Sequence, residues 1–209
     1  ATLPDLQAKI DAAADNATIT LDSNTEIAAT LQITKNLTLD LNGCTLRMTG
    51  TGSVLKVSGR ATLTITDSSA AKSGTITGGN AEYGGGVYVD DYAALKMTGG
   101  CITGCHASRG GGGIYSSGNL YMGGTAKIEK CTGSDDAIWN RENSDIYADG
   151  GTVDGTVNNQ GTIKRSEGAA AVTVFNGTVY NRSAGTIIAG IYNGTVENNG
   201  TISGGTFCG

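Results

Sequence analysis

Short runs of alternating apolar and polar residues, separated by glycine and asparagine, recur along most of the chain. Thr75-Ile76-Thr77 places one apolar residue between two polar ones, and Val87-Tyr88-Val89 places an aromatic residue between two valines. Alternation with a period of two over so few residues is typical of half-buried strands, and helical spacing is absent from this region. The pattern therefore predicts a chain of many short β-strands joined by tight bends.

The strand pattern repeats at a fixed interval in the middle of the chain. Ile76, Ile102 and Ile128 are evenly spaced along the sequence, and the same short strand pattern surrounds each of them. Repeats of about 20 to 50 residues indicate stacked units, because one such unit cannot bury its apolar face alone. Equivalent residues of successive repeats are then about 4.8 Å apart, the spacing of paired strands. The three isoleucines are therefore expected to form a ladder inside the stack.

The repeat becomes shorter toward the C-terminus. The tripeptide GTV begins at positions 155, 177 and 194, and GTI begins at 161, 185 and 200. Within each series the starting positions draw closer together along the chain, which predicts smaller repeats with a narrower cross-section. The apolar residues of these tripeptides are expected to point inward: Val157, Val179, Val196, Ile163, Ile187 and Ile202.

One helix is predicted, at the N-terminus, from Asp5 to Ala14. Leu6 and Ile10 mark its apolar face, and Asp5 can cap its first turn. A strand from Ala17 to Leu21 follows. A short amphipathic helix in this place would cover the open apolar end of the stack, which would otherwise invite strand addition. We therefore divide the chain into a helical cap, 1–16, and a single stacked-strand domain, 17–209.

Two groups of motifs resemble a known family. DLQAKIDAA, TITL and ITKNLTLDLNGCTL, all before residue 47, are similar to the N-terminal part of right-handed parallel β-helix proteins of the pectate-lyase-like superfamily. GGGVYV and GGGGIY, each preceded by GTIT or GCIT, resemble repeats of adhesin-like bacterial surface proteins. The resemblance implies an all-β, right-handed parallel β-helix (solenoid) with a short N-terminal capping helix. It also implies a bacterial protein that is secreted or held at the cell surface, and hence an extracellular location.

The C-terminal end shows no capping element after Phe207. An uncovered end of a strand stack presents unpaired backbone groups. Either the chain is a fragment of a longer protein, or self-association through this end covers it.

Composition and charge narrow the range of partners. Glycine contributes 34 residues and proline 1, which suits tight bends between strands, while glycine at every third position, the collagen pattern, is absent. The net charge is −5, which disfavours nucleic acid as a partner because the phosphate backbone needs a basic surface. No apolar run approaches the roughly 18 residues of a membrane span, so we expect no membrane insertion.

An apolar-aromatic pair recurs in three successive repeats. Tyr88, Tyr115 and Trp139 each follow a residue that is expected to point inward, so alternation along the strand turns the three rings outward. Aromatic side chains offer sugars a large rigid apolar area with a polar edge. The three rings are candidate ligand-binding residues for a polysaccharide or a host or cell-surface glycan. The alternative is that a loop or another chain covers the ladder.

Acidic residues supply the candidates for catalysis. Polysaccharide lyases and hydrolases use carboxylates with calcium or as an acid and base pair. Asp90, Asp91, Asp135 and Asp136 would be catalytic if the protein were an enzyme, and Asp67 is a further acidic bend residue. Adjacent residues of a strand point to opposite faces, so Asp90 and Asp91 share a face only within a bend. Solvated bend residues are the simpler interpretation, and we expect no catalytic residue.

Cysteines offer one further chemical candidate. Cys105 and Cys131 occupy equivalent positions one repeat apart, within reach of a disulfide, although a stacked pair of small buried residues is the simpler interpretation. Cys101, Cys105 and His106 do not make a zinc site, because a structural site needs four well-placed ligands. We expect no metal and no cofactor.

The sequence thus favours a non-enzymatic, adhesin-like or carbohydrate-binding module. A polysaccharide lyase or glycoside hydrolase is the alternative, and a passive structural spacer is the second alternative. Fold alone does not decide among these functions.

Overall fold

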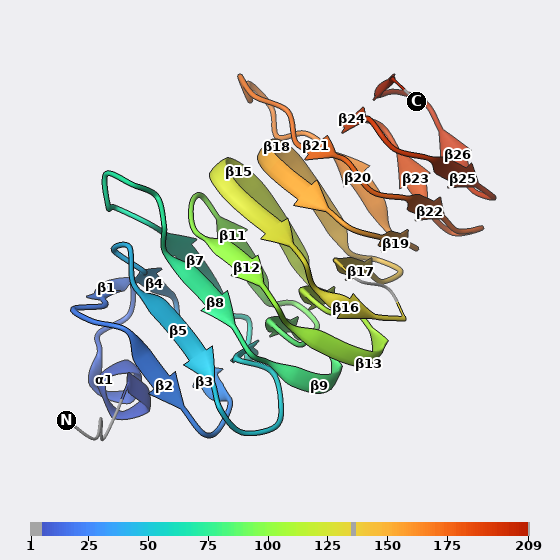
Figure 1. Cartoon of the computed structure of the whole chain (residues 1–209). Helices are drawn as coiled ribbons and strands as arrows, with labels where there is room; N and C mark the ends of the chain where they lie inside the picture. The colour runs from blue at the N-terminus through green and yellow to red at the C-terminus, as the bar shows by residue number, and fades with distance from the viewer. Residues whose placement is uncertain (1–5, 135–136, 209) are drawn as a thin grey trace.

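The structure is a computed structural model that describes residues 6–134 and 137–208. It is predominantly β, with long parallel sheets and one short helix, α1 (Leu6–Ala12). The strands succeed one another from the N-terminal helix, drawn in blue, to the last strands, drawn in red (Figure 1). The predicted parallel stacking of short strands is confirmed, and the arrangement is consistent with a β-helix-like solenoid. Within the described ranges, no helix is long and apolar enough to span a bilayer.

The largest sheet contains 16 strands, which form two rows of parallel neighbours. The first row consists, in stacking order, of β1 (Ala17–Thr20), β4 (Leu37–Asp40), β7 (Thr62–Thr66), β11 (Ala94–Met97), the first half of β15 (Asn119–Glu129), the first half of β18 (Asp145–Asp154), β20 (Thr162–Lys164), β23 (Thr186–Ile187) and β26 (Thr201–Ile202). The second row consists of β2 (Thr25–Ile27), β5 (Thr45–Met48), β8 (Thr75–Thr77), β12 (Cys101–Thr103), the second halves of β15 and β18, β21 (Val174–Phe175), β24 (Ile191–Tyr192) and β27 (Thr206–Phe207).

Two smaller parallel sheets complete the structure. The third row is β3 (Leu31–Ile33), β6 (Leu55–Val57), β10 (Val87–Val89), β14 (Ile114–Ser116), β17 (Ile138–Asn140), β19 (Val157–Asn159), β22 (Val179–Asn181) and β25 (Val196–Asn198). A three-stranded sheet, β9 (Asn80–Tyr83), β13 (His106–Gly110) and β16 (Thr132–Gly133), lies between the second and third rows in the chain order of the middle repeats.

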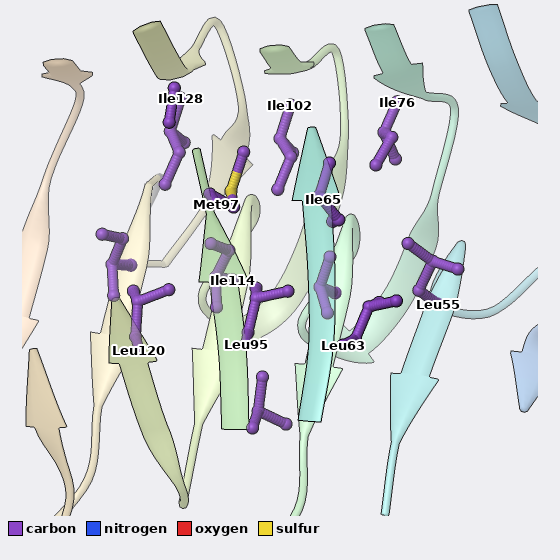
Figure 2. Close-up of a cluster of buried hydrophobic side chains, with 14 of the residues drawn as sticks. Leu55, Leu63, Ile65, Ile76, Leu95, Met97, Ile102, Ile114, Leu120 and Ile128 are labelled. Atoms are coloured by element: carbon purple, nitrogen blue, oxygen red, sulfur yellow. The ribbon is translucent and has the colours of Figure 1, made fainter. Parts of the chain in front are cut away.

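Columns of apolar side chains fill the interior, because in-register pairing places equivalent residues above one another. Ile76 pairs with Ile102, and Ile102 pairs with Ile128, as their even spacing in the sequence predicts. All three are fully buried, and Figure 2 shows them above a second column that includes Leu95 and Leu120. Each fully buried side chain of this kind contributes about 1.5–3 kcal/mol, so stability accumulates repeat by repeat.

The N-terminal helix covers the exposed edge of strand β3. The side chain of Gln7 satisfies both backbone groups of Gln32 at this edge, as a neighbouring strand would. Its amide nitrogen donates to the Gln32 carbonyl at 3.1 Å, and its oxygen accepts from the Gln32 amide at 2.7 Å. At the other end of the helix, Lys35 Nζ donates to the carbonyls of Asp11 and Ala13. The helix is shorter than the predicted span to Ala14, and the proposed cap at Asp5 lies outside the described residues.

A ladder of buried asparagines runs along the inner side of the third row, and the sequence analysis did not predict it. Asn140, Asn159 and Asn181 have no exposed surface, and each donates through Nδ2 to the next amide oxygen, at 2.8, 2.8 and 2.7 Å. The last acceptor is Asn198, which is exposed. The ladder continues the column that begins with apolar residues such as Val57 in the earlier repeats.

Aromatic rings fill the narrower C-terminal repeats. Phe175 and Tyr192 stack with their centroids 5.1 Å apart, and Tyr192 and Phe207 stack at 5.0 Å. The Tyr192 hydroxyl donates to the Ala189 carbonyl at 2.6 Å, and burial raises the pKa of this phenol. Phe207 remains 45% exposed, so the last ring of the stack has an uncovered face.

Candidate functional site

The predicted aromatic column is present in the third row. Tyr88 pairs in register with Tyr115, and Tyr115 pairs with Trp139. The Tyr88 and Tyr115 rings are stacked with centroids 4.9 Å apart, whereas Tyr115 meets Trp139 edge-on at 5.8 Å. The predicted register is therefore confirmed, while the binding role of these three residues stays a prediction.

The expectation that all three rings are exposed is wrong at the middle of the column. Tyr115 retains only 6% of its surface, because the ring of Tyr83 packs over it at 4.9 Å and reaches Trp139 at 5.8 Å. Tyr83 lies in β9, a strand that precedes the column in the chain and pairs with β13 in the three-stranded sheet. The four rings form one packed cluster, which we call the aromatic cluster.

Tyr88 is the member of the aromatic cluster that offers hydrogen-bonding capacity to a ligand. Its ring is enclosed by Tyr115 on one side and by the Lys56 ammonium, 5.1 Å from the centroid. The half-buried environment, together with the neighbouring Tyr115, raises the pKa of the Tyr88 phenol. Within the described ranges the Tyr88 hydroxyl has no hydrogen-bond partner. A ligand would therefore meet the edge and hydroxyl of this ring rather than its face.

Two arginines hold the other tyrosine hydroxyls of the aromatic cluster. A hydrogen bond with Tyr83, reinforced by the Glu82 carboxylate, raises the pKa of the Arg109 guanidinium, and Arg109 Nε lies 2.8 Å from Glu82. A hydrogen bond with Tyr115 likewise raises the pKa of Arg141. Tyr83 and Tyr115 therefore interact with charged neighbours through their hydroxyls, whereas the Tyr88 hydroxyl has no such partner among the described residues.

Trp139 lies flat against the backbone of Gly110. A Cβ atom at Gly110 would overlap Cε3 and Cζ3 of the Trp139 indole. The indole Nε1 is buried without a hydrogen-bond partner among the described residues. The position of this ring therefore depends on glycine at 110.

Replacing Gly110 by alanine is expected to displace the indole and to change the tryptophan emission spectrum. Trp139 is the one tryptophan of the chain, so the fluorescence reports on this ring alone. Gly123→Ala is a suitable control, because a Cβ there would meet only Met97 O, at 3.9 Å. An unchanged emission maximum in Gly110→Ala would contradict the described packing.

A shallow polar groove adjoins the aromatic cluster. Its walls come from the bend before β6, from β9 (labelled in Figure 1) and from β10, so both Tyr83 and Tyr88 border it. The remaining lining residues are small or polar: Thr51, Gly52, Ser53, Asn80, Ala81, Glu82 and Ser108. Hydroxyls, amides and one carboxylate beside a tyrosine edge are suited to a ligand that is rich in hydroxyl groups.

The candidate catalytic acids are only partly brought together. Asp90 and Asp91 lie in the bend after β10, where Asp90 is 3.7 Å from Lys56 Nζ and accepts a hydrogen bond from the Asp91 amide at 3.1 Å. Asp135 and Asp136 lie outside the described residues. Asp91 instead shares a surface hollow with Glu142, which the sequence analysis did not consider.

Asp67 is a structural residue. Its carboxylate is 2% exposed and accepts hydrogen bonds from the amides of Gly74, Gly43 and Ser69 at 2.6, 2.8 and 3.1 Å. It therefore ties the bend at 67–74 to the previous repeat. Asp40 has a similar role, because it accepts from two backbone amides at 2.9 Å.

The paired cysteines occupy equivalent positions, as predicted. Thr132 N donates to the Cys105 carbonyl at 2.8 Å, which places the two cysteines in adjacent repeats. Both are thiols, and the described residues contain no disulfide. A hydrogen bond from Cys131 lowers the pKa of the Cys105 thiol, although burial opposes this shift. The structure therefore holds them as a stacked pair of thiols, and the disulfide stays a prediction.

In the part of the chain that the structure describes, no group of three or more His, Cys, Asp or Glu side chains is placed to hold a metal ion.

A second pair of tyrosines lies on the outer side of the first row. Tyr121 and Tyr147 are nearly parallel, with centroids 4.2 Å apart and planes 7° from parallel. Lys96 caps one end at 5.4 Å and Lys164 the other at 4.8 Å. Lys164 also pairs with Asp145 at 2.6 Å. The two tyrosines are separated in the sequence by the same interval as the isoleucines of the inner column, but the sequence analysis did not use this signal.

Comparison with known proteins assigns neither a family nor a function to the chain. No protein-family model matches the chain, and no match was found among curated proteins or solved structures.

Proposed function

We propose that the chain is a non-enzymatic carbohydrate-binding module of adhesin-like type, in which the groove beside Tyr88 holds a segment of polysaccharide or cell-surface glycan. The observation that supports this most is the Tyr88 hydroxyl, which has no partner within the described ranges and borders a groove of hydroxyl and amide groups. The closed packing of Tyr83 and Tyr115 behind it keeps the edge of Tyr88 in a fixed position, which lowers the entropic cost of binding.

We infer a single right-handed parallel β-helix of the pectate-lyase-like type, capped at its N-terminus by the helix through Gln7 and Lys35. We further propose an extracellular or cell-surface location, and self-association through the C-terminal edge. The support for self-association is the exposed apolar surface at that edge, on Ile202 and Phe207.

Binding to a panel of insoluble and soluble polysaccharides tests the function. Retention of the protein without release of new reducing or unsaturated ends is the expected result. Tyr88→Ala should weaken retention about tenfold, the factor expected when one well-placed aromatic contact is lost. Tyr88→Phe should reproduce part of this loss, because only the hydroxyl is removed.

Tyr180→Ala is the matched control. Tyr180 also points outward from the third row, and Arg182 lies over its ring at 4.8 Å, but it is outside the groove. Equal losses in Tyr88→Ala and Tyr180→Ala would refute the assigned site. No retention on any member of the panel would refute the binding function and leave the structural spacer.

One observation favours an enzyme as the second candidate. Asp91 and Glu142 border the same hollow, as the carboxylates of a glycoside hydrolase do. Both side chains are exposed, whereas a general acid of such an enzyme needs burial to keep its proton near neutral pH. Product release that is lost in Asp91→Asn and Glu142→Gln would replace the binding module with this candidate.

A further inference from the structure

The bends that follow the third row differ in length, and this difference creates a notch. Four residues, 90–93, separate β10 from β11, and four residues, 141–144, separate β17 from β18. The repeat between them has only two, 117–118, between β14 and β15. Two long bends therefore stand on either side of a short one. Because they are two repeats apart, the gap between them is about 10 Å.

The long bends present one residue each in a single column. Arg60, Tyr92 and Asn143 are the third residues of the bends 58–61, 90–93 and 141–144, and all three have a left-handed backbone, with φ of 65°, 63° and 63°. The Arg60 guanidinium lies over the Tyr92 ring, 5.4 Å from its centroid. The short bend contributes no residue to this column. The place next to Tyr92, on the side away from Arg60, is therefore vacant.

The notch has an aromatic wall and many unused hydrogen-bonding groups. Tyr92 is 81% exposed, which is a large fraction for a tyrosine. Apart from Ala93, the other lining side chains are polar. Within the described ranges, these polar side chains form no hydrogen bond or ion pair among themselves or with other side chains: Asp91, Ser117, Asn119, Glu142 and Asn143.

We propose that this notch is a saccharide-binding site in which a neutral hexose ring stacks on Tyr92 and takes the place of the missing bend residue. An aromatic ring with an open face binds the apolar face of a pyranose, and the surrounding carboxylates and amides bond its hydroxyls. Asp91 and Glu142 are acidic, so a uronic acid is repelled. The notch shares its class of ligand with the proposed function and rests on it in that respect.

The notch lies beyond the C-terminal end of strand β10. Tyr88 borders the groove, and Tyr92 lies four residues further along the chain, in the bend that follows β10. Four extended residues span about 13 Å, at about 3.3 Å each, so the Cα atoms of the two tyrosines lie within this distance. A linear polysaccharide that lies along β10 therefore meets the groove at one end and the notch at the other.

Amide chemical-shift mapping tests the inference on the uniformly labelled chain. The probes are hexamers of β-1,4-linked glucose and of β-1,4-linked mannose, with hexagalacturonate as the acidic counterpart. We expect a neutral hexamer to shift the amides of Gly118 and Asn119, and hexagalacturonate to leave them unchanged. Tyr92→Ala should weaken this binding about tenfold, and Tyr92→Phe should retain it.

Ser117→Tyr is the decisive variant, because it places a large side chain at the floor of the notch, fills the vacant space and leaves the lining acids unchanged. Ser117 is partly exposed and has no left-handed backbone, so the fold tolerates the change. The variant should abolish the shifts at Gly118 and Asn119 while the shifts at 80–83, beside Tyr88, persist.

Three outcomes would overturn the notch. These are no shift at Gly118 with any neutral hexamer, shifts that survive Ser117→Tyr, and a response to spermidine in place of the saccharides, which would indicate a cation site. Shifts confined to 80–83 would refute the notch and keep the proposed function. Shifts confined to Gly118 and Asn119 would refute the Tyr88 groove and keep the notch.

Discussion

Replacing Asn159 by alanine is expected to lower the free energy of unfolding by about 3–4 kcal/mol. Asn159 accepts from Asn140 Nδ2 and donates to Asn181 Oδ1, both at 2.8 Å, and it also donates to the Gly161 carbonyl at 3.0 Å. The residue has no exposed surface, so water cannot replace it. Its loss leaves Asn181 Oδ1 without its donor and Asn140 Nδ2 with only the Ser144 carbonyl, at 3.3 Å. A buried polar group that is left unsatisfied costs about 1–3 kcal/mol, and the lost hydrogen bonds add to this cost.

Urea denaturation monitored by circular dichroism measures this effect. Asn193→Ala is the matched control, because Asn193 donates to Asn176 Oδ1 at 2.9 Å in a similar amide pair that is exposed to solvent. The control should change stability by less than about 0.5 kcal/mol. Similar losses in the two variants would show that burial is not what makes the inner ladder strong.

Asp67→Asn is expected to cost about 2–3 kcal/mol at pH 7. The carboxylate accepts three backbone hydrogen bonds, whereas an asparagine amide would turn its NH₂ group toward one of the same donors. Gly74 N is the closest donor, at 2.6 Å, so the charge on the acceptor contributes strongly to this bond.

The cost of Asp67→Asn should disappear in acid. Burial raises the pKa of Asp67, but the hydrogen bonds from Ser69, Gly74 and Gly43 outweigh it and hold the pKa below its ordinary value. A carboxyl group with a lowered pKa in the folded state contributes stability above its unfolded pKa of about 3.9, and the contribution is lost as the pH falls through the folded value. The difference between wild type and variant should therefore be full at pH 7 and shrink below about pH 4.

Urea titrations at pH 7 and pH 3 check both the size and the direction of the Asp67 effect. Asp22→Asn, at an exposed position, serves as the control and should leave stability nearly unchanged at either pH. A difference between wild type and Asp67→Asn that grows in acid would contradict the lowered pKa.

The columns of the stack were predictable from the sequence, because residues that lie one repeat length apart in the sequence pair in register in adjacent strands. Ile76, Ile102 and Ile128 fall in register, and so do Tyr88 and Tyr115. Periodic alternation decides which side chains point inward, and equal repeat lengths decide which ones meet. Both the direction of the side chains and the pairing of the repeats can therefore be read from the sequence without knowledge of side-chain packing.

The packing of the Tyr83 ring over the aromatic column was not predictable in the same way. Tyr83 reaches Tyr115 because β9 runs beside β13 with a shift of register between Ala107 and Gly110. That irregularity depends on Gly110, which leaves room for the Trp139 ring. Three-dimensional packing of this kind has no period in the sequence.

Other features carried a signal that the sequence analysis did not use. The paired residues Val87 and Ile114 lie further apart in the sequence than the next pair, Leu95 and Leu120, so the bend after Ile114 is shorter than its counterpart in the previous repeat. The asparagine ladder also follows a short motif, in which asparagine stands two positions after an inward isoleucine or valine, as in Ile138 and Asn140 or Val157 and Asn159. A comparison of intervals in neighbouring columns would have located the short bend, and the recurrence of this motif would have located the ladder.

The pairing of each repeat with only its two neighbours has a thermodynamic consequence. The total stability is close to a sum of one term per repeat and one per interface, as in a one-dimensional chain of coupled units. Ile102, for example, pairs with Ile76 on one side and with Ile128 on the other. A substitution that weakens one repeat therefore lowers the stability of its two direct neighbours first, and it reaches more distant repeats only through the repeats between them.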